Sequence, residues 1–203
     1  MSVVATVGGV AVPVDEVDAA ETRLRGRRGA AALPARGTAE GRQLRRWLTQ
    51  LIVTERVVAA EAAARGLSGR GAPDEQELLP DATARLEIGS VAAAVLADPH
   101  ARALFADVTA AVSVPDEEVA AYHARNPLRF ADPRRGSHGW RVPPPAAPPL
   151  DEVRSAIAAH LLGAARRRAF RVWLDARRAA LVRLAPGYEH PGDPRQPDNT
   201  HRH

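Results

Sequence analysis

The chain has 203 residues, of which 45% are hydrophobic but only 4% aromatic, so a core must be built mainly from alanine, valine and leucine. It contains no cysteine, which excludes disulfides, cysteine-ligated zinc and thiol nucleophiles. All 28 basic residues are arginine, which excludes chemistry that depends on a Schiff-base or P-loop lysine. The formal net charge of +4 is modest and does not by itself indicate a nucleic-acid partner.

The N-terminal segment carries no recognisable targeting signal. Residues 1–18 have neither a basic start nor an uninterrupted apolar run, unlike a usual secretory signal peptide. No stretch approaches the ~20 consecutive apolar residues that a membrane-spanning helix needs. The sequence therefore predicts a cytoplasmic protein with no membrane partner.

The first predicted element is a β-hairpin over Val3–Val12. Alternating valines lie on either side of Gly8 and Gly9, a pair that suits a tight turn. A helix over Val14–Arg25 is expected next, with acidic side chains in its first turn, where the helix dipole favours them. Residues 26–37 are rich in glycine and alanine and are expected to form a loop.

The segment Gly41–Gly66 has the strongest helical periodicity in the chain. Thr38 can cap the start of this helix, and Gly66 can end it in the left-handed conformation. Apolar side chains recur at three- and four-residue steps, which predicts one buried face. The residues of this face are Leu44, Trp47, Leu48, Leu51, Ile52 and Val58. We expect this helix to be central, with both ends of the chain packed against it.

The middle of the chain is predicted to form shorter helices. The first covers residues 81–96, with Leu86 facing inward and Gly89 as a weak point. The next two cover residues 98–108 and 115–125, and a proline stands near the start of each, where its fixed φ suits the first helical turn.

The C-terminal part begins with a proline-rich, irregular loop over residues 131–149. A last long helix is expected from Leu150 to about Leu184, because apolar residues again recur at helical spacing. Residues 185–203 form a tail rich in histidine and proline, with neither a helix nor a strand pattern.

These elements predict a fold of the mainly α class. It has a short N-terminal β-hairpin, a long central helix and a long C-terminal return helix. Residues 1–130 and 150–184 are expected to form one split helical domain, 1–184, joined through the proline-rich loop. The tail is expected to follow this domain.

Four segments, in this order, resemble the core of SurA-type and parvulin-type chaperones. VATVGGVAVPVDEVDAA resembles their strand pair and first helix, and QLRRWLTQLIVTERVVAAEAAARGL resembles their long helix. The most specific match is VSVPDEEVAAYHARNPLRF, the helix that precedes the prolyl-isomerase domain in that family; VRSAIAAHLLGAARRRAFRVWLDARRAALV resembles the return helix. Here only residues 131–149 stand where that domain would be. The resemblance implies a SurA N-terminal-like domain that lacks the isomerase.

The resemblance also implies a function. A chaperone-like core implies a binding protein. We expect it to hold an extended peptide or an apolar small molecule in a helix-lined cleft, without isomerase activity. Large apolar and aromatic side chains are the candidates for lining this cleft. They are Trp47, Leu51, Tyr122, Trp140 and Trp173.

The tail contains a possible set of metal ligands. Imidazole and carboxylate groups are the usual ligands of divalent transition metals when cysteine is absent. His201 and His203 form an H-x-H pair, whose rings can lie on one side of an extended segment. The candidate ligands are His190, Asp193, Asp198, His201 and His203.

An enzyme is therefore the alternative interpretation. His138 and His190 are the candidate catalytic groups of a metal- or histidine-dependent biosynthetic enzyme that acts on a small molecule. Its site would be formed by the tail and the proline-rich loop, since loops commonly carry functional residues. No segment resembles the G-x-S-x-G nucleophile elbow, so a hydrolase triad is not indicated. The sequence leaves open whether the protein is an enzyme.

Arginines are concentrated in the last long helix. Arg167, Arg171 and Arg178 share one side of it at helical spacing, and such a stripe can bind phosphates or an anionic polymer. No zinc finger, DNA-reading helix or aromatic sheet accompanies the stripe. Nucleic acid is therefore not an expected partner, and the stripe is interpreted as a solvated face.

Overall fold

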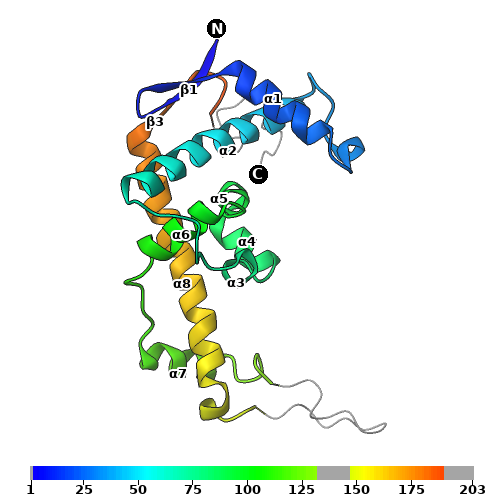
Figure 1. Cartoon of the computed structure of the whole chain (residues 1–203). Helices are drawn as coiled ribbons and strands as arrows, with labels where there is room; N and C mark the ends of the chain where they lie inside the picture. Colours follow the sequence, from blue (N-terminus) through cyan, green and yellow to red (C-terminus); the bar gives the residue numbers. More distant parts are fainter. Residues whose placement is uncertain (1, 132–146, 190–203) are drawn as a thin grey trace, which may run out of the picture.

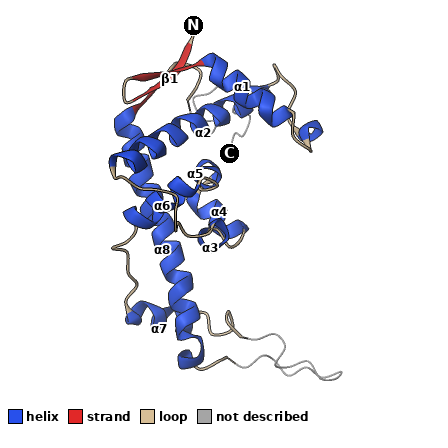
Figure 2. Cartoon of the chain, in the orientation of Figure 1, coloured by secondary structure: helices blue, strands red, loops and turns tan. Residues whose placement is uncertain are grey.

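A computed structural model describes residues 2–131 and 147–189 of the chain. Within these ranges the protein is mainly helical, with a small antiparallel sheet at one end and a long C-terminal helix that runs from this sheet to the opposite end (Figures 1 and 2). This confirms the predicted fold class, including the N-terminal hairpin, the long central helix and the long return helix. No helix in these ranges combines the length and the apolar character needed to span a bilayer.

The N-terminal hairpin consists of β1 (Val3–Val7) and β2 (Val10–Pro13). Gly8 and Gly9 connect them with φ angles of 56° and 83°, which side chains with a Cβ rarely adopt. The turn glycines were therefore identified correctly from the sequence. The hairpin leads directly into α1 (Val14–Arg25).

A third strand, β3 (Val182–Leu184), pairs with the free edge of β1, giving the order β2-β1-β3. The predicted extension of the last helix to about Leu184 was therefore wrong, because the helix ends at Leu181. Beyond that point the backbone bonds to β1 instead: the amide of Gly8 donates to the carbonyl of Leu181 at 2.9 Å, and that of Ala185 donates to the carbonyl of Val4 at 2.9 Å. This sheet joins the two ends of the described chain.

The central helix is α2 (Ala39–Ala64), preceded by a short 3-10 turn, η1 (Ala30–Ala32). Its start is capped as predicted, because the Thr38 hydroxyl accepts a hydrogen bond from the amide of Gly41 at 3.0 Å. Its end is also as predicted: Gly66 has φ of 63°, and the next amide returns to the carbonyl of Ala62.

The burial of α2 differs from the predicted single face. Val53 and Val57 are fully buried although neither was assigned to that face, whereas Trp47, Leu51 and Ile52 are only half-buried. The helix is enclosed over a wider arc because α5, α6 and β1 all pack on it in addition to α1. The part of the predicted core face that contains Trp47, Leu51 and Ile52 is therefore open to solvent.

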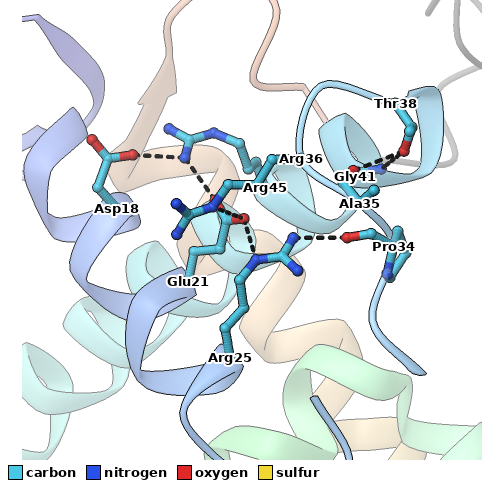
Figure 3. Close-up of polar contacts among 9 residues, drawn as sticks. All are labelled: Asp18, Glu21, Arg25, Pro34, Ala35, Arg36, Thr38, Gly41 and Arg45. Carbon is cyan, nitrogen blue, oxygen red and sulfur yellow. Dashed lines mark hydrogen bonds and ion pairs between the residues drawn. The ribbon is translucent and has the colours of Figure 1, made fainter. Parts of the chain in front are cut away.

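A buried carboxylate fastens α1 to α2 and to the loop between them (Figure 3). Glu21 is only 2% exposed and accepts hydrogen bonds from Arg25 at 2.8 Å, Arg45 at 2.9 Å and Arg36 at 3.1 Å. Burial alone would raise the pKa of Glu21, but the three guanidinium groups outweigh it and lower the pKa to about 2. Arg25 also donates to the carbonyl of Pro34, which fixes the loop.

The middle of the chain forms α3 (Glu75–Leu78), α4 (Ala82–Ile88), α5 (Ser90–Val95) and α6 (Pro99–Val108). The single helix predicted over residues 81–96 is wrong. Gly89 breaks it with φ of 90° and ψ of 149°, a conformation that no helix contains.

The break also overturns the predicted orientation of Leu86. This side chain is 81% exposed, whereas Ala84 and Ile88 face the core. Because α4 and α5 are separate helices, the buried face of one does not continue into the other.

The last two helices are α7 (Asp116–Arg125) and α8 (Leu150–Leu181). Two hydrophobic clusters lie along α8. Phe170 and Leu174 belong to the main core with α2, α5, α6 and the sheet. A smaller distal cluster forms between α7 and the first half of α8, at the end of the molecule farthest from the sheet (Figure 1). Its buried members are Val119, Val153 and Ile157.

Candidate functional site

The predicted cleft residues do not lie in one place. Trp47 and Leu51 line the same hollow beside α2. Trp173 instead packs on Phe170, with ring centroids 5.5 Å apart, and the Arg65 guanidinium lies 5.4 Å from its ring. Tyr122 belongs to the distal cluster, where its hydroxyl lies 3.4 Å from Nε2 of His160.

Trp140, the remaining cleft candidate, lies outside the described residues. Of the described candidates, only Trp47 and Leu51 therefore share a surface.

That surface is a groove between α1, α2 and α5. It consists of two adjoining hollows with volumes of about 590 Å³ and about 390 Å³. The two hollows share residues from all three sides, which makes the groove continuous. The shared residues are Arg23, Ile52, Glu55, Ala94 and Ala97.

The walls of the groove are mostly apolar and contain many small side chains. Ala19 from α1, Ala59 from α2, and Ala94 and Ala97 from α5 and its end line the larger hollow. Trp47, with Leu24, Leu48 and Leu51, lines the smaller one. Alanine walls leave space for the side chains of a ligand, while the leucines and the tryptophan supply apolar contact area.

Charged side chains form the rim of the larger hollow. Glu16 and Arg56 form an ion pair at 2.5 Å and neutralise each other. Glu55, Asp98 and Arg23 also line this hollow, and Asp98 caps α6 by accepting a hydrogen bond from the amide of His100 at 2.8 Å. Partial burial between the walls raises the pKa of Glu55; Arg23 opposes this rise and Asp98 adds to it. The larger hollow therefore contains one more acidic side chain than basic ones, and Arg27 in the smaller hollow balances this difference over the whole groove.

Trp47 is held in place at the edge of the smaller hollow. Its indole Nε1 donates a hydrogen bond to the Ser90 hydroxyl at 3.1 Å. This bond connects α2 to α5 and orients the ring along the wall. A ligand in the smaller hollow would contact an indole that is already positioned.

The predicted metal and catalytic residues cannot be placed in this geometry. His138 lies in residues 132–146 and His190 in the tail, both outside the described ranges. The other proposed ligands, Asp193, Asp198, His201 and His203, also lie outside them. Within residues 2–131 and 147–189, no group of three His, Asp or Glu side chains is arranged to hold a metal ion.

Sequence reasoning missed most of the groove. It identified Trp47 and Leu51, but not the alanines of the walls or Glu55. Exposed alanines on α1 and α2 were the available signal, because an amphipathic surface helix usually carries polar residues on its outer side. Glu55 stands three residues after Ile52 on α2, and this spacing places both on one side of the helix.

Comparison with known proteins gives one match. A family of unknown function, DUF7158, matches residues 3–40, which contain β1, β2, α1 and the loop that leads to α2. The α1 wall of the groove lies within this segment. Neither the curated proteins nor the solved structures include one that matches the chain.

Proposed function

We propose that the protein binds an extended peptide segment in the groove between α1, α2 and α5. The observation that carries this proposal is the groove itself: two adjoining, mostly apolar hollows that are open to solvent and lined by alanine, leucine and other aliphatic side chains. Apolar side chains entering such hollows would lose contact with water at a gain of about 25 cal/mol per Å². The resemblance to SurA-type cores supports the same class of ligand.

The shape of the groove favours a peptide over a compact small molecule. The larger and smaller hollows adjoin through a shared strip at Ile52 and Glu55, so a ligand filling both must be elongated. In an extended peptide, side chains on one face can enter successive hollows while the backbone stays in solvent. Glu55 lines both hollows, so its carboxylate can pair with a basic residue next to the apolar ones.

Fluorescence of Trp47 tests this proposal directly. The chain has 3 tryptophans, so substituting Trp140→Phe and Trp173→Phe leaves Trp47 as the only reporter. A short peptide that alternates leucine and serine and carries one arginine should shift the Trp47 emission saturably. An apolar anilinonaphthalene dye serves as the small-molecule probe. If the dye binds and the peptide does not, the peptide assignment is wrong.

A pair of neighbouring alanines provides a matched control. Ala59 lines the larger hollow and Ala60, next to it, does not, although both are exposed on α2. Ala59→Phe should fill the hollow and weaken peptide binding at least ~tenfold, which is ~1.4 kcal/mol. Ala60→Phe should leave binding unchanged. Equal effects of the two substitutions would show that the peptide binds elsewhere.

A further inference from the structure

A second site is indicated by arginines on α8 that have only neutral hydrogen-bond partners or none among the described residues; Arg171, for example, donates to the carbonyl of Glu87 at 3.1 Å. Some arginines of this helix have carboxylate partners: Arg167 contacts Glu87 at 2.8 Å and Arg177 pairs with Glu61. In the described part of the chain, Arg168, Arg171 and Arg178 have no carboxylate within ion-pair distance. These three residues lie on one face of α8 at three- and seven-residue steps.

Arg178 is the least expected of the three. It is half-buried, and its Nη2 donates to the neutral side-chain oxygen of Gln50, while its Nε is buried without a partner among the described residues. Burial lowers the pKa of Arg178, and Asp175 only partly opposes this effect. A guanidinium that has lost water without gaining an anion is costly, so its surroundings favour a negatively charged ligand.

A pocket of about 180 Å³ opens beside Arg178, between α8 and the junction of α4 and α5. Arg171, Ser90 and the carboxylate of Asp175 also line this arginine pocket. The Ser90 oxygen already accepts a hydrogen bond from Trp47, so its hydroxyl hydrogen is free to be donated elsewhere.

The charge around the arginine pocket is positive overall. A smaller hollow of about 160 Å³ adjoins it through Arg171 and adds the guanidinium of Arg168. Glu87 lines that hollow, but its carboxylate is bonded to Arg167. Asp175 is the remaining acid of the two hollows, against the three guanidinium groups of Arg168, Arg171 and Arg178.

We infer that the arginine pocket binds a small oxyanion of the phosphate type, held by the guanidinium groups of Arg171 and Arg178 and by the Ser90 hydroxyl. Guanidinium groups match the geometry of phosphate oxygens and form charge-assisted hydrogen bonds with them. The volume suits a single phosphate group rather than a nucleic-acid strand. The phosphate is either free or carried as a monoester. This site is separate from the peptide groove, so the two proposals can fail independently.

Isothermal titration calorimetry of the full chain tests the inference. Inorganic phosphate and phosphoserine are titrated in separate arms, with sodium chloride holding the ionic strength constant. Saturable binding in either arm supports the site, and the tighter ligand identifies the form of phosphate that is preferred. Absence of binding in both arms overturns the inference.

Variants then locate the binding. Arg171→Gln should weaken binding roughly ten- to a hundredfold, because a charge-assisted hydrogen bond is lost. Arg171 is exposed and its bond to the Glu87 carbonyl lies at the surface, so the variant should still fold, which its thermal unfolding curve checks. Arg171→Lys should retain part of the affinity. Arg154→Gln removes a charge from the distal end of the same helix and should have no effect. If it weakens binding as much as Arg171→Gln, the effect is one of general charge and the pocket is not the site.

Discussion

At the scale of single residues, Glu21 makes stability depend on pH. Its pKa is lowered from 4.5 to about 2, so its carboxylate stabilises the fold above the unfolded-state pKa. This contribution, about 3 kcal/mol, is lost as the pH falls from about 4.5 towards 2. Urea unfolding measured at a series of pH values should show the free energy of unfolding decreasing through this window.

Substitutions separate Glu21 from the other carboxylates. Glu21→Gln should lower the free energy of unfolding at pH 7 and flatten the acid limb, because the amide leaves the three arginines without a counter-charge. Asp18→Asn is the control, since Asp18 is 54% exposed and, among the described residues, pairs with Arg45 alone. Surface pairs of this kind contribute at most ~1 kcal/mol. Equal decreases in the free energy of unfolding of the two variants would contradict the role given to Glu21.

Glu55 should make ligand binding depend on pH. Its pKa is raised, so it becomes neutral at a higher pH than an ordinary glutamate does. Arg23 and Asp98 face it, and the Glu16–Arg56 pair stays balanced nearby. Affinity for a basic, apolar peptide should therefore fall as the pH is lowered through the Glu55 titration.

The test for Glu55 is the dissociation constant measured from Trp47 fluorescence at several pH values. Glu55→Gln should bind the basic peptide more weakly at neutral pH and lose this part of the pH dependence. A peptide with its arginine replaced by glutamine should show little pH dependence with either protein. An unchanged pH profile in Glu55→Gln would assign the titration to another group.

At the scale of elements, the start of α2 depends on a close approach of two backbone segments. A Cβ added at Gly41 would lie 2.2 Å from the carbonyl oxygen of Ala35, although alanine is normally the better helix former. Gly41→Ala should therefore lower the free energy of unfolding by about 1–3 kcal/mol, through displacement of the loop.

The control for this substitution is the same change at another helix end. At Gly26 the backbone has φ of −81°, and an added Cβ would have its nearest neighbour at 3.6 Å, an ordinary contact. Gly26→Ala should be neutral or slightly stabilising, because it restricts the unfolded chain. Thermal or urea unfolding of both variants measures the two effects. A lower free energy of unfolding in Gly26→Ala alone would contradict the role given to Gly41.

Helix and turn boundaries were predictable where the signal is local. Thr38 caps α2 through a bond to an amide three residues away, and Gly8 and Gly9 form their turn by their own conformational freedom. β3 was not predictable, because Val182 continues a helical pattern and becomes a strand only by pairing with β1. Gly89 carried a visible signal, but whether a glycine breaks a helix depends on tertiary packing.

The groove was less predictable than the fold. Ala59 and Ala60 look alike in the sequence, and only the packing of α1 and α5 against α2 places one in the wall and the other outside it. Glu55 reads as a solvated position on a helix. Its pKa is raised first by partial burial between the walls of the groove; Asp98 adds to this rise and Arg23 opposes it. Hydrophobic periodicity describes neighbours along one helix, so it cannot predict which distant side chains surround Glu55.

At the scale of the whole molecule, the two hydrophobic clusters should unfold at different free energies. The distal cluster has few buried members, whereas the main core contains most of the buried apolar residues. Hydrogen exchange should therefore be faster in α7 and the first half of α8 than around Phe170, since regions with little buried apolar contact open at lower cost.

Two truncations test this difference. Ile157 and Phe170 are both fully buried, one in each cluster. Ile157→Ala should accelerate exchange in α7 and its partner half of α8 alone. Phe170→Ala should lower global stability by about 3–5 kcal/mol and accelerate exchange throughout. Uniform acceleration by Ile157→Ala would mean that α8 transmits all local openings and that the molecule unfolds as one unit.

The pairing of β1 with β3 has a consequence for synthesis. β1 is made almost at once, but the strand that covers its second edge is added only after α8 has been translated. During that interval the nascent hairpin presents an unpaired edge, the type of surface that recruits foreign strands. Val182–Leu184 therefore completes the sheet late in synthesis, because it can pair with β1 only after α8 has left the ribosome.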